Sequence, residues 1–259
     1  MTLDPQVRAL IDQFQSQVPT DTHLSVDEMR ELSKLVYKRN SVEPVSQVLS
    51  EVIPGPGGVI PIRIYKPKSR GPLPVLVYFH GGGWVFGSLE ISDALCRSFA
   101  NKAECIVVSV DYRLAPEYFF PAAADDCYAA VKWVSENAAS FGGDPLSVAV
   151  GGDSAGGNLA ASVCLMARDQ MLPKIICQLL IYPIISPNFD SPTYLEYGKG
   201  FLFDREKLIW CWDLYAPDTI DRRNPYLSPI YSTGLQNLPP AIIVTAEFDP
   251  LRHEGEAYA

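Results

Sequence analysis

The chain has 259 residues, of which 47% are hydrophobic, and it carries a formal net charge of −9 at pH 7. This length and apolar content suit one domain with a sizeable core, and the acidic excess argues against nucleic acid or an anionic membrane surface as a partner. No apolar run approaches the ~20 residues of a membrane span, and the first residues lack the apolar centre of a signal peptide.

The first 45 residues are predicted to form two amphipathic helices. Asp4 and Pro5 suit the cap and first position of a helix, and apolar residues then recur at helical spacing until Pro19. Ser25 and Glu28 form a capping box ahead of a second apolar stripe. Two helices before any strand suit an N-terminal cap over residues 1–45, although they would also be expected if they only pack against the core.

Strands alternate with helices from residue 46 to 183. A hairpin is expected first, around the turn sequence PGPGG. Strands are then expected at 75–79, 105–110, 147–150, 175–182 and 241–246, and helices near 91–101, 122–137 and 155–169. This alternation predicts a mostly parallel sheet flanked by helices, in which ligands bind beyond the carboxyl ends of the strands.

A G-x-S-x-G motif lies between the strand at 147–150 and the helix that follows it. Gly152 and Gly156 leave room for a sharp turn, and Ser154 is expected to lie exposed at a helix N-terminus. Because this motif occurs by chance in about one chain of this length in ten, its strand–turn–helix context carries much of its meaning.

A run of three glycines, in the sequence HGGGW, follows the strand at 75–79. Glycines placed after a buried strand can turn their N–H groups toward a developing oxyanion, here from Gly82 and Gly83 together with Ala155 after the serine. The alternative is a flexible or phosphate-binding loop. No P-loop and no dinucleotide-binding glycine pattern accompanies it.

Residues 184–217 interrupt the alternation with prolines and aromatic side chains, and we interpret them as a second cap segment before the remaining core residues, 218–259. Aromatic side chains above the serine would form an apolar acyl pocket. Trp84, Tyr182 and Phe203 are our candidates for substrate binding. Six scattered cysteines without metal-ligand spacing are expected to be buried thiols of a cytoplasmic protein that holds no metal.

Several motifs in a fixed order resemble the hormone-sensitive-lipase-like family of bacterial esterases. They are HGGGW, DYRLAPE, GDSAGGNLA, IYP, NPYLSP and AEFDPLRHEGEAYA. The resemblance implies an α/β-hydrolase fold with a helical cap, a Ser-Asp-His triad, no cofactor, a small-molecule ester as substrate and a possible homodimer. Matched by motif, Ser154 is the nucleophile, Asp249 the triad acid, and Gly82, Gly83 and Ala155 the oxyanion donors.

The triad histidine of that family has no match in this sequence. The family places it roughly thirty residues after the acid, whereas ten residues follow Asp249 here, so we expect the last strand and helix of the fold to be missing. The three histidines present have other expected places: His80 in the glycine loop, His253 on the surface or as a substitute base, and His23 between cap helices.

These observations predict a serine carboxylesterase for short- to medium-chain acyl esters, with doubtful activity in the chain itself. Two other interpretations stay open: a non-catalytic small-ligand-binding protein on the same fold, as in the plant gibberellin receptors, and an inactive truncated fragment. Glu247 is a weaker candidate than Asp249 for the acid, and Asp153 is expected to cap its own turn.

Overall fold

The computed structural model describes residues 3–17, 24–37, 42–201 and 204–259. Its centre is an open sheet in which seven described strands lie in the order β1-β2-β4-β3-β5-β6-β7. The strands are β1 (Gln47–Gly55), β2 (Gly58–Lys66), β3 (Leu73–Phe79), β4 (Ile106–Val110), β5 (Gly143–Asp153), β6 (Gln178–Ile181) and β7 (Ala241–Val244).

The sheet is antiparallel at one edge and parallel elsewhere. β2 pairs antiparallel with both β1 and β4, whereas β4-β3-β5-β6-β7 pair in parallel. The predicted hairpin is confirmed, with Gly55 opposite Gly58. β4 is buried along its whole length, because helices cover both faces of a parallel sheet and leave no polar side for its residues.

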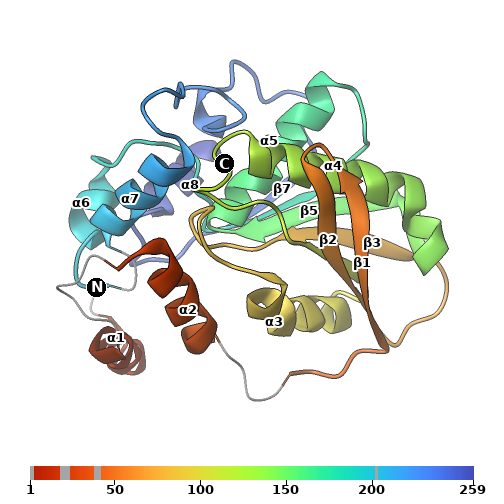
Figure 1. Ribbon diagram of the computed structural model, residues 1–259, viewed down its shortest axis with the longest axis horizontal. Coiled ribbons are helices and arrows are strands. Elements are labelled where there is room, and N and C mark those ends of the chain that lie inside the picture. Colours follow the sequence, from red (N-terminus) through yellow and green to blue (C-terminus); the bar gives the residue numbers. More distant parts are fainter. Residues whose placement is uncertain (1–2, 18–23, 38–41, 202–203) are drawn as a thin grey trace.

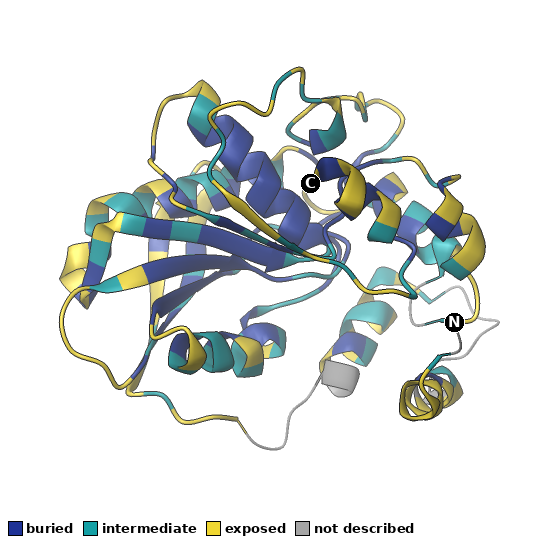
Figure 2. Cartoon of the chain, turned by 180° about the vertical axis from the view of Figure 1, so that it is seen from behind, coloured by how far each residue is buried: buried dark blue, intermediate teal, exposed yellow. Residues whose placement is uncertain are grey.

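Helices cover the two faces of the sheet (Figure 1). α3 (Leu89–Lys102) lies on one face, and α4 (Ala122–Asn137) and α5 (Ala155–Asp169) lie on the other. The core divides accordingly. A large cluster under α4 and α5 includes Phe79 and Leu159, and a smaller one under α3 includes Tyr78 and Cys96. The central strands are buried and the outer helix faces exposed (Figure 2).

Four further helices gather beside the carboxyl ends of the parallel strands (Figure 1). They are α1 (Pro5–Gln17), α2 (Val26–Tyr37), α6 (Pro192–Tyr197) and α7 (Arg205–Tyr215). α1 and α2 are the two helices predicted from the N-terminal periodicity. The last helix, α8 (Arg252–Tyr258), follows β7, and two short 3₁₀ turns lie at Ala138–Phe141 and Pro229–Tyr231.

The predicted elements of the core agree closely with the structure. The helices expected at 122–137 and 155–169 have those bounds. β5 is longer than predicted, and the strand expected at 175–182 is confined to Gln178–Ile181. Among the described residues, no helix has the length and apolar character needed to cross a membrane.

Candidate active site

Ser154 occupies a sharp turn between β5 and α5. Its backbone lies in a sparsely populated region, with φ 53° and ψ −117°, which a non-glycine residue adopts only where its surroundings enforce it. A side chain on Gly152 would clash with the backbone of Gly156, and one on Gly156 would clash with the backbone of Phe79. The two glycines of the motif are therefore required by backbone packing.

Backbone hydrogen bonds fix this turn to the next strand. The Ser154 N–H donates to the carbonyl of Ile181 at 2.9 Å, and the Ser154 carbonyl accepts from the N–H of Ile184 at 3.1 Å. Main-chain hydrogen bonds therefore hold the serine at the ends of both β5 and β6.

The glycine loop presents N–H groups beside the serine's cavity. Gly82 and Gly83 have φ values of 119° and 57°, which glycine adopts without strain. The Gly82 carbonyl accepts from the N–H groups of Val85 and Phe86, each at 3.0 Å, and this closes the turn. Within the described residues, the N–H groups of Gly82, Gly83 and Ala155 have no protein acceptor.

Asp153 connects the serine turn to the glycine loop. Its Oδ1 accepts from the Tyr78 hydroxyl at 2.6 Å and from the Gly81 N–H at 3.0 Å. These two partners come from β3 and from the loop after it, so the carboxyl bonds beyond its own turn. Burial raises the pKa of this carboxyl, while hydrogen bonds from Tyr78, from the Gly81 backbone and from the Asp153 backbone itself oppose that rise.

His80 is buried at the start of the glycine loop, as expected. Its ring stacks on Tyr112 with centroids 4.3 Å apart, and its Nδ1 lies 2.8 Å from the carbonyl of Gly81. Burial lowers the pKa of His80 to about 4, so the ring is neutral at neutral pH and Nδ1 is the donor. His253 is exposed on α8, and His23 lies outside the described residues.

Asp249 follows β7 and is largely buried. Its Oδ1 accepts from the N–H of Leu251 at 2.9 Å, and burial is the main cause that raises its pKa. Glu247 is more exposed, and its carbonyl accepts from Arg252. Asp249 lines the same cavity as Ser154.

That cavity has a volume of about 1280 Å³ and is bounded by the sheet edge and by the helices at the strand ends. Its described lining includes His80, Gly82, Gly83, Phe86, Ser154, Tyr182 and Asp249. Residues from four separate loops therefore meet in one space, as their positions after predicted strands indicated.

The three predicted substrate-binding residues have different outcomes. Trp84 is fully buried, stacked on Tyr215 at 4.5 Å and set edge-on to Trp212 at 5.0 Å, so it packs the molecule beneath the loop. Phe203 lies outside the described residues. Tyr182 does line the cavity.

Several side chains around the site were not predicted from the sequence. Cys211 of α7 lies against Gly83 and lines the cavity, and Met29 and Leu32 of α2 line it as well. Glu254 is buried on α8 and accepts from the Ser186 N–H at 2.8 Å, which fastens α8 to the segment after β6. For the α2 residues, the apolar stripe was the available signal. Its periodicity predicts that one face of the helix is buried, but it does not show that this face lines the cavity.

Comparisons with known proteins agree with this geometry. A family model described as alpha/beta hydrolase fold matches residues 76–259. The chain is 40% identical over 262 residues to an arylesterase from Saccharolobus solfataricus, covering all of this chain and 85% of the relative. It is 47% identical over 213 residues to carboxylic ester hydrolase LipN from Mycobacterium tuberculosis, covering 80% of this chain and 57% of that relative.

Comparison with solved structures also identifies esterases as similar proteins. A hyperthermophilic esterase from Pyrobaculum calidifontis superposes with a TM-score of 0.93 at 42% identity, covering all of this chain and 84% of that one. The fold and the cavity thus define an α/β hydrolase. The chain belongs to the alpha/beta hydrolase fold family, and the relatives named here are esterases.

Proposed function

We propose that this chain, an ester hydrolase by family, is a serine carboxylesterase in which Ser154 is the nucleophile. The observation that carries the proposal is the strained turn at Ser154, which opens into the same cavity as two glycines whose N–H groups have no described acceptor. Unpartnered N–H groups beside a nucleophile are what an oxyanion requires.

The proposed chemistry is acyl transfer. The Ser154 hydroxyl oxygen attacks the ester carbonyl, the alcohol leaves, and water then hydrolyses the acyl-enzyme. The N–H groups of Gly82, Gly83 and Ala155 hold the oxyanion, each contributing about 3–4 kcal/mol to transition-state stabilisation. Asp249 would orient the base, as the acid of a triad does.

A base must take the proton of Ser154, and neither described histidine forms a hydrogen bond with it. The Nδ1 of His80 faces the Gly81 carbonyl, and its Nε2 is buried without a partner among the described residues. His253 is exposed and does not line the cavity. We therefore propose that turnover by this chain is low, near the roughly 10³–10⁴-fold over water that oxyanion stabilisation and binding provide without a complete triad.

The proposed substrates are short- to medium-chain acyl esters. The cavity lining is mostly apolar, which supports acyl esters as substrates. Hydrolysis of p-nitrophenyl esters from C2 to C16 tests this, and a higher kcat/KM for C16 than for C4–C8 would overturn it.

A second candidate is a non-catalytic small-ligand-binding protein on the same fold. The observation that favours it is that no described histidine forms a hydrogen bond with Ser154, together with the cavity's volume. Binding without turnover would show as ligand-dependent thermal stabilisation, with no difference in ester hydrolysis between the wild type and Ser154→Ala.

Covalent labelling decides between the two. The full chain is treated with a fluorophosphonate and the modified residue is identified by mass spectrometry. We expect label on Ser154, none in Ser154→Ala, and unchanged labelling in Ser98→Ala. Ser98 is the matched control because it lines the same cavity on α3 and bonds Glu43. Label retained in Ser154→Ala would overturn the assignment of the nucleophile.

A further inference from the structure

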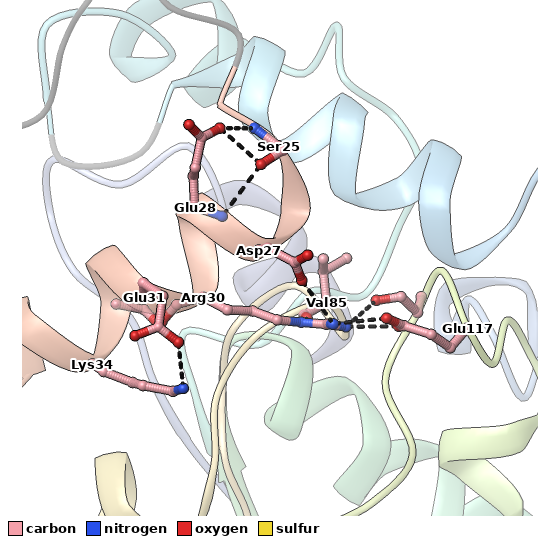
Figure 3. A network of polar contacts seen from close by, with 10 residues as sticks. Ser25, Asp27, Glu28, Arg30, Glu31, Lys34, Val85 and Glu117 are labelled. Carbon is pink, nitrogen blue, oxygen red and sulfur yellow. Dashed lines mark hydrogen bonds and ion pairs between the residues drawn. The ribbon is translucent and has the colours of Figure 1, made fainter.

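Arg30 of α2 forms hydrogen bonds with three residues of the core (Figure 3). Its Nε donates to the Val85 carbonyl at 2.9 Å, and its Nη2 donates to the Ala115 carbonyl at 3.0 Å. Its Nη1 and Nη2 each donate to one carboxylate oxygen of Glu117 at 2.7 Å. The planar guanidinium therefore joins the helix to two separate loops of the core.

The two carbonyls belong to segments that are already connected. The Ala115 N–H donates to the Trp84 carbonyl at 2.9 Å, so Arg30 bridges the loop after β3 and the loop after β4 at the point where they meet. Val85 and Ala115 are both fully buried. Without the guanidinium their carbonyls would lose these partners, which is costly for buried polar groups.

The contact with Val85 acts on the turn that carries the proposed oxyanion donors. The carbonyl of Val85 and the N–H of Phe86 belong to one peptide unit. Arg30 holds that unit by its oxygen, and the Gly82 carbonyl holds it by its N–H at 3.0 Å. A shift of this peptide would be transmitted to Gly82 and Gly83 within the same tight turn.

The neighbours of Arg30 on α2 also line the cavity. Met29, Leu32 and Ser33 line it together with Gly82, Gly83 and Phe86. The Arg30 side chain therefore connects α2, which lines the cavity, to the glycine loop, which carries the proposed oxyanion donors.

We propose that Arg30 is a positioning residue that aligns α2 with the glycine loop, with Glu117 as the carboxylate that orients it. The inference rests on the proposed function, in that the loop's N–H groups are taken as oxyanion donors. Lysine should not replace arginine here, because a single ammonium cannot reproduce the planar fork that reaches two carbonyls and both carboxylate oxygens.

The variants Arg30→Lys and Glu117→Gln test the proposal, with Lys34→Ala as the matched control. Lys34 lies on the same helix, and its ion pair with Glu31 is exposed, the two side chains being 58% and 70% accessible. Glu117→Gln is the milder variant, since the Glu117 side chain is 51% accessible. All are measured well below their unfolding temperatures.

We expect Arg30→Lys to lower kcat for p-nitrophenyl butyrate, and the rate of Ser154 labelling, by about tenfold, the scale of a lost charge-assisted hydrogen bond. KM should change less, because an oxyanion contact acts mainly in the transition state. Glu117→Gln should give a smaller loss in the same direction, and Lys34→Ala less than twofold.

Hydrogen exchange of the peptide covering residues 82–88 is independent of turnover. We expect faster exchange there in Arg30→Lys and Glu117→Gln but not in Lys34→Ala. Unchanged exchange and unchanged kcat in Arg30→Lys would overturn the positioning role, as would a loss seen only in KM. If wild type and Ser154→Ala hydrolyse esters equally, the proposed function fails, while the exchange data still decide whether Arg30 holds the loop.

Discussion

The cavity has two walls that are built in different ways. On the core side, backbone meets backbone: Gly156 lies against Phe79, and Ser154 bonds to Ile181 and Ile184. On the cap side, α1 rests on few contacts, with Leu10 59% exposed and Ile11 buried. The side of the cavity that carries Ser154 is thus held by main-chain packing. The side that carries α1 depends on a few side chains, which can be substituted without disturbing the main chain.

Adding one methyl group to the core wall should have the largest effect. Gly156→Ala places a Cβ against the backbone of Phe79, and because main chain cannot rotate away, we expect a loss of about 3 kcal/mol or more in unfolding free energy. Urea denaturation measures it. Gly234→Ala is the control, since its Cβ meets only the end of the Gln236 side chain. Equal stability of the two variants would show that the elbow can relax.

Protonation of His80 should be the next largest effect. Burial lowers its folded pKa from 6.5 to about 4, so the unfolded chain takes up the proton first as the pH falls. The contribution of the neutral ring is complete above pH 6.5 and declines toward pH 4, a difference of about 3 kcal/mol.

The pH dependence of unfolding checks this. Between pH 6.5 and 4.5, His80→Gln should lose less stability than the wild type, whatever its stability at neutral pH. His253→Gln, which changes an exposed histidine on α8, should keep the wild-type slope. A His80→Gln slope equal to that of the wild type would contradict the burial of a neutral ring.

The cap wall should tolerate change where it is exposed. Leu10→Ala is expected to alter the free energy of unfolding by no more than about 0.5 kcal/mol, because the side chain is 59% exposed. Ile11→Ala, one residue along, removes a side chain that is 2% exposed and should cost about 2 kcal/mol. Thermal unfolding of the two variants measures this difference. Equal losses of stability would contradict docking of α1 through the face that carries Ile11.

The same contrast separates what could be predicted from what could not. The elbow and α5 were predictable because glycine spacing and apolar periodicity are local signals. The contact of Asp153 with Gly81 was not predictable because the two residues are 72 positions apart. Arg30 gave no signal at all, since its contacts with Val85 and Glu117 span 55 and 87 residues. Local patterns specify elements, whereas contacts between distant polar groups depend on how those elements dock.

Trp84 illustrates a second limit. Its neighbours in the sequence are the glycines of the loop, so an aromatic ring there suggested a pocket wall. Its own backbone has φ 60°, which turns the side chain into the stack with Tyr215 and Trp212 instead. The direction of a side chain next to a glycine run depends on backbone angles that cannot be predicted from the sequence.

The central place of β5 in the sheet bears on how the protein acquires its pocket during folding. β5 pairs with β3 on one side and with β6 on the other, and Ser154 bonds to the end of β6. Pairings between distant segments form slowly, because long loops must close first. Helices α4 and α5 can form early from local contacts, but the turn at Ser154 reaches its final shape only after residues 178–184 have docked. The proposed nucleophile would then be a late product of folding.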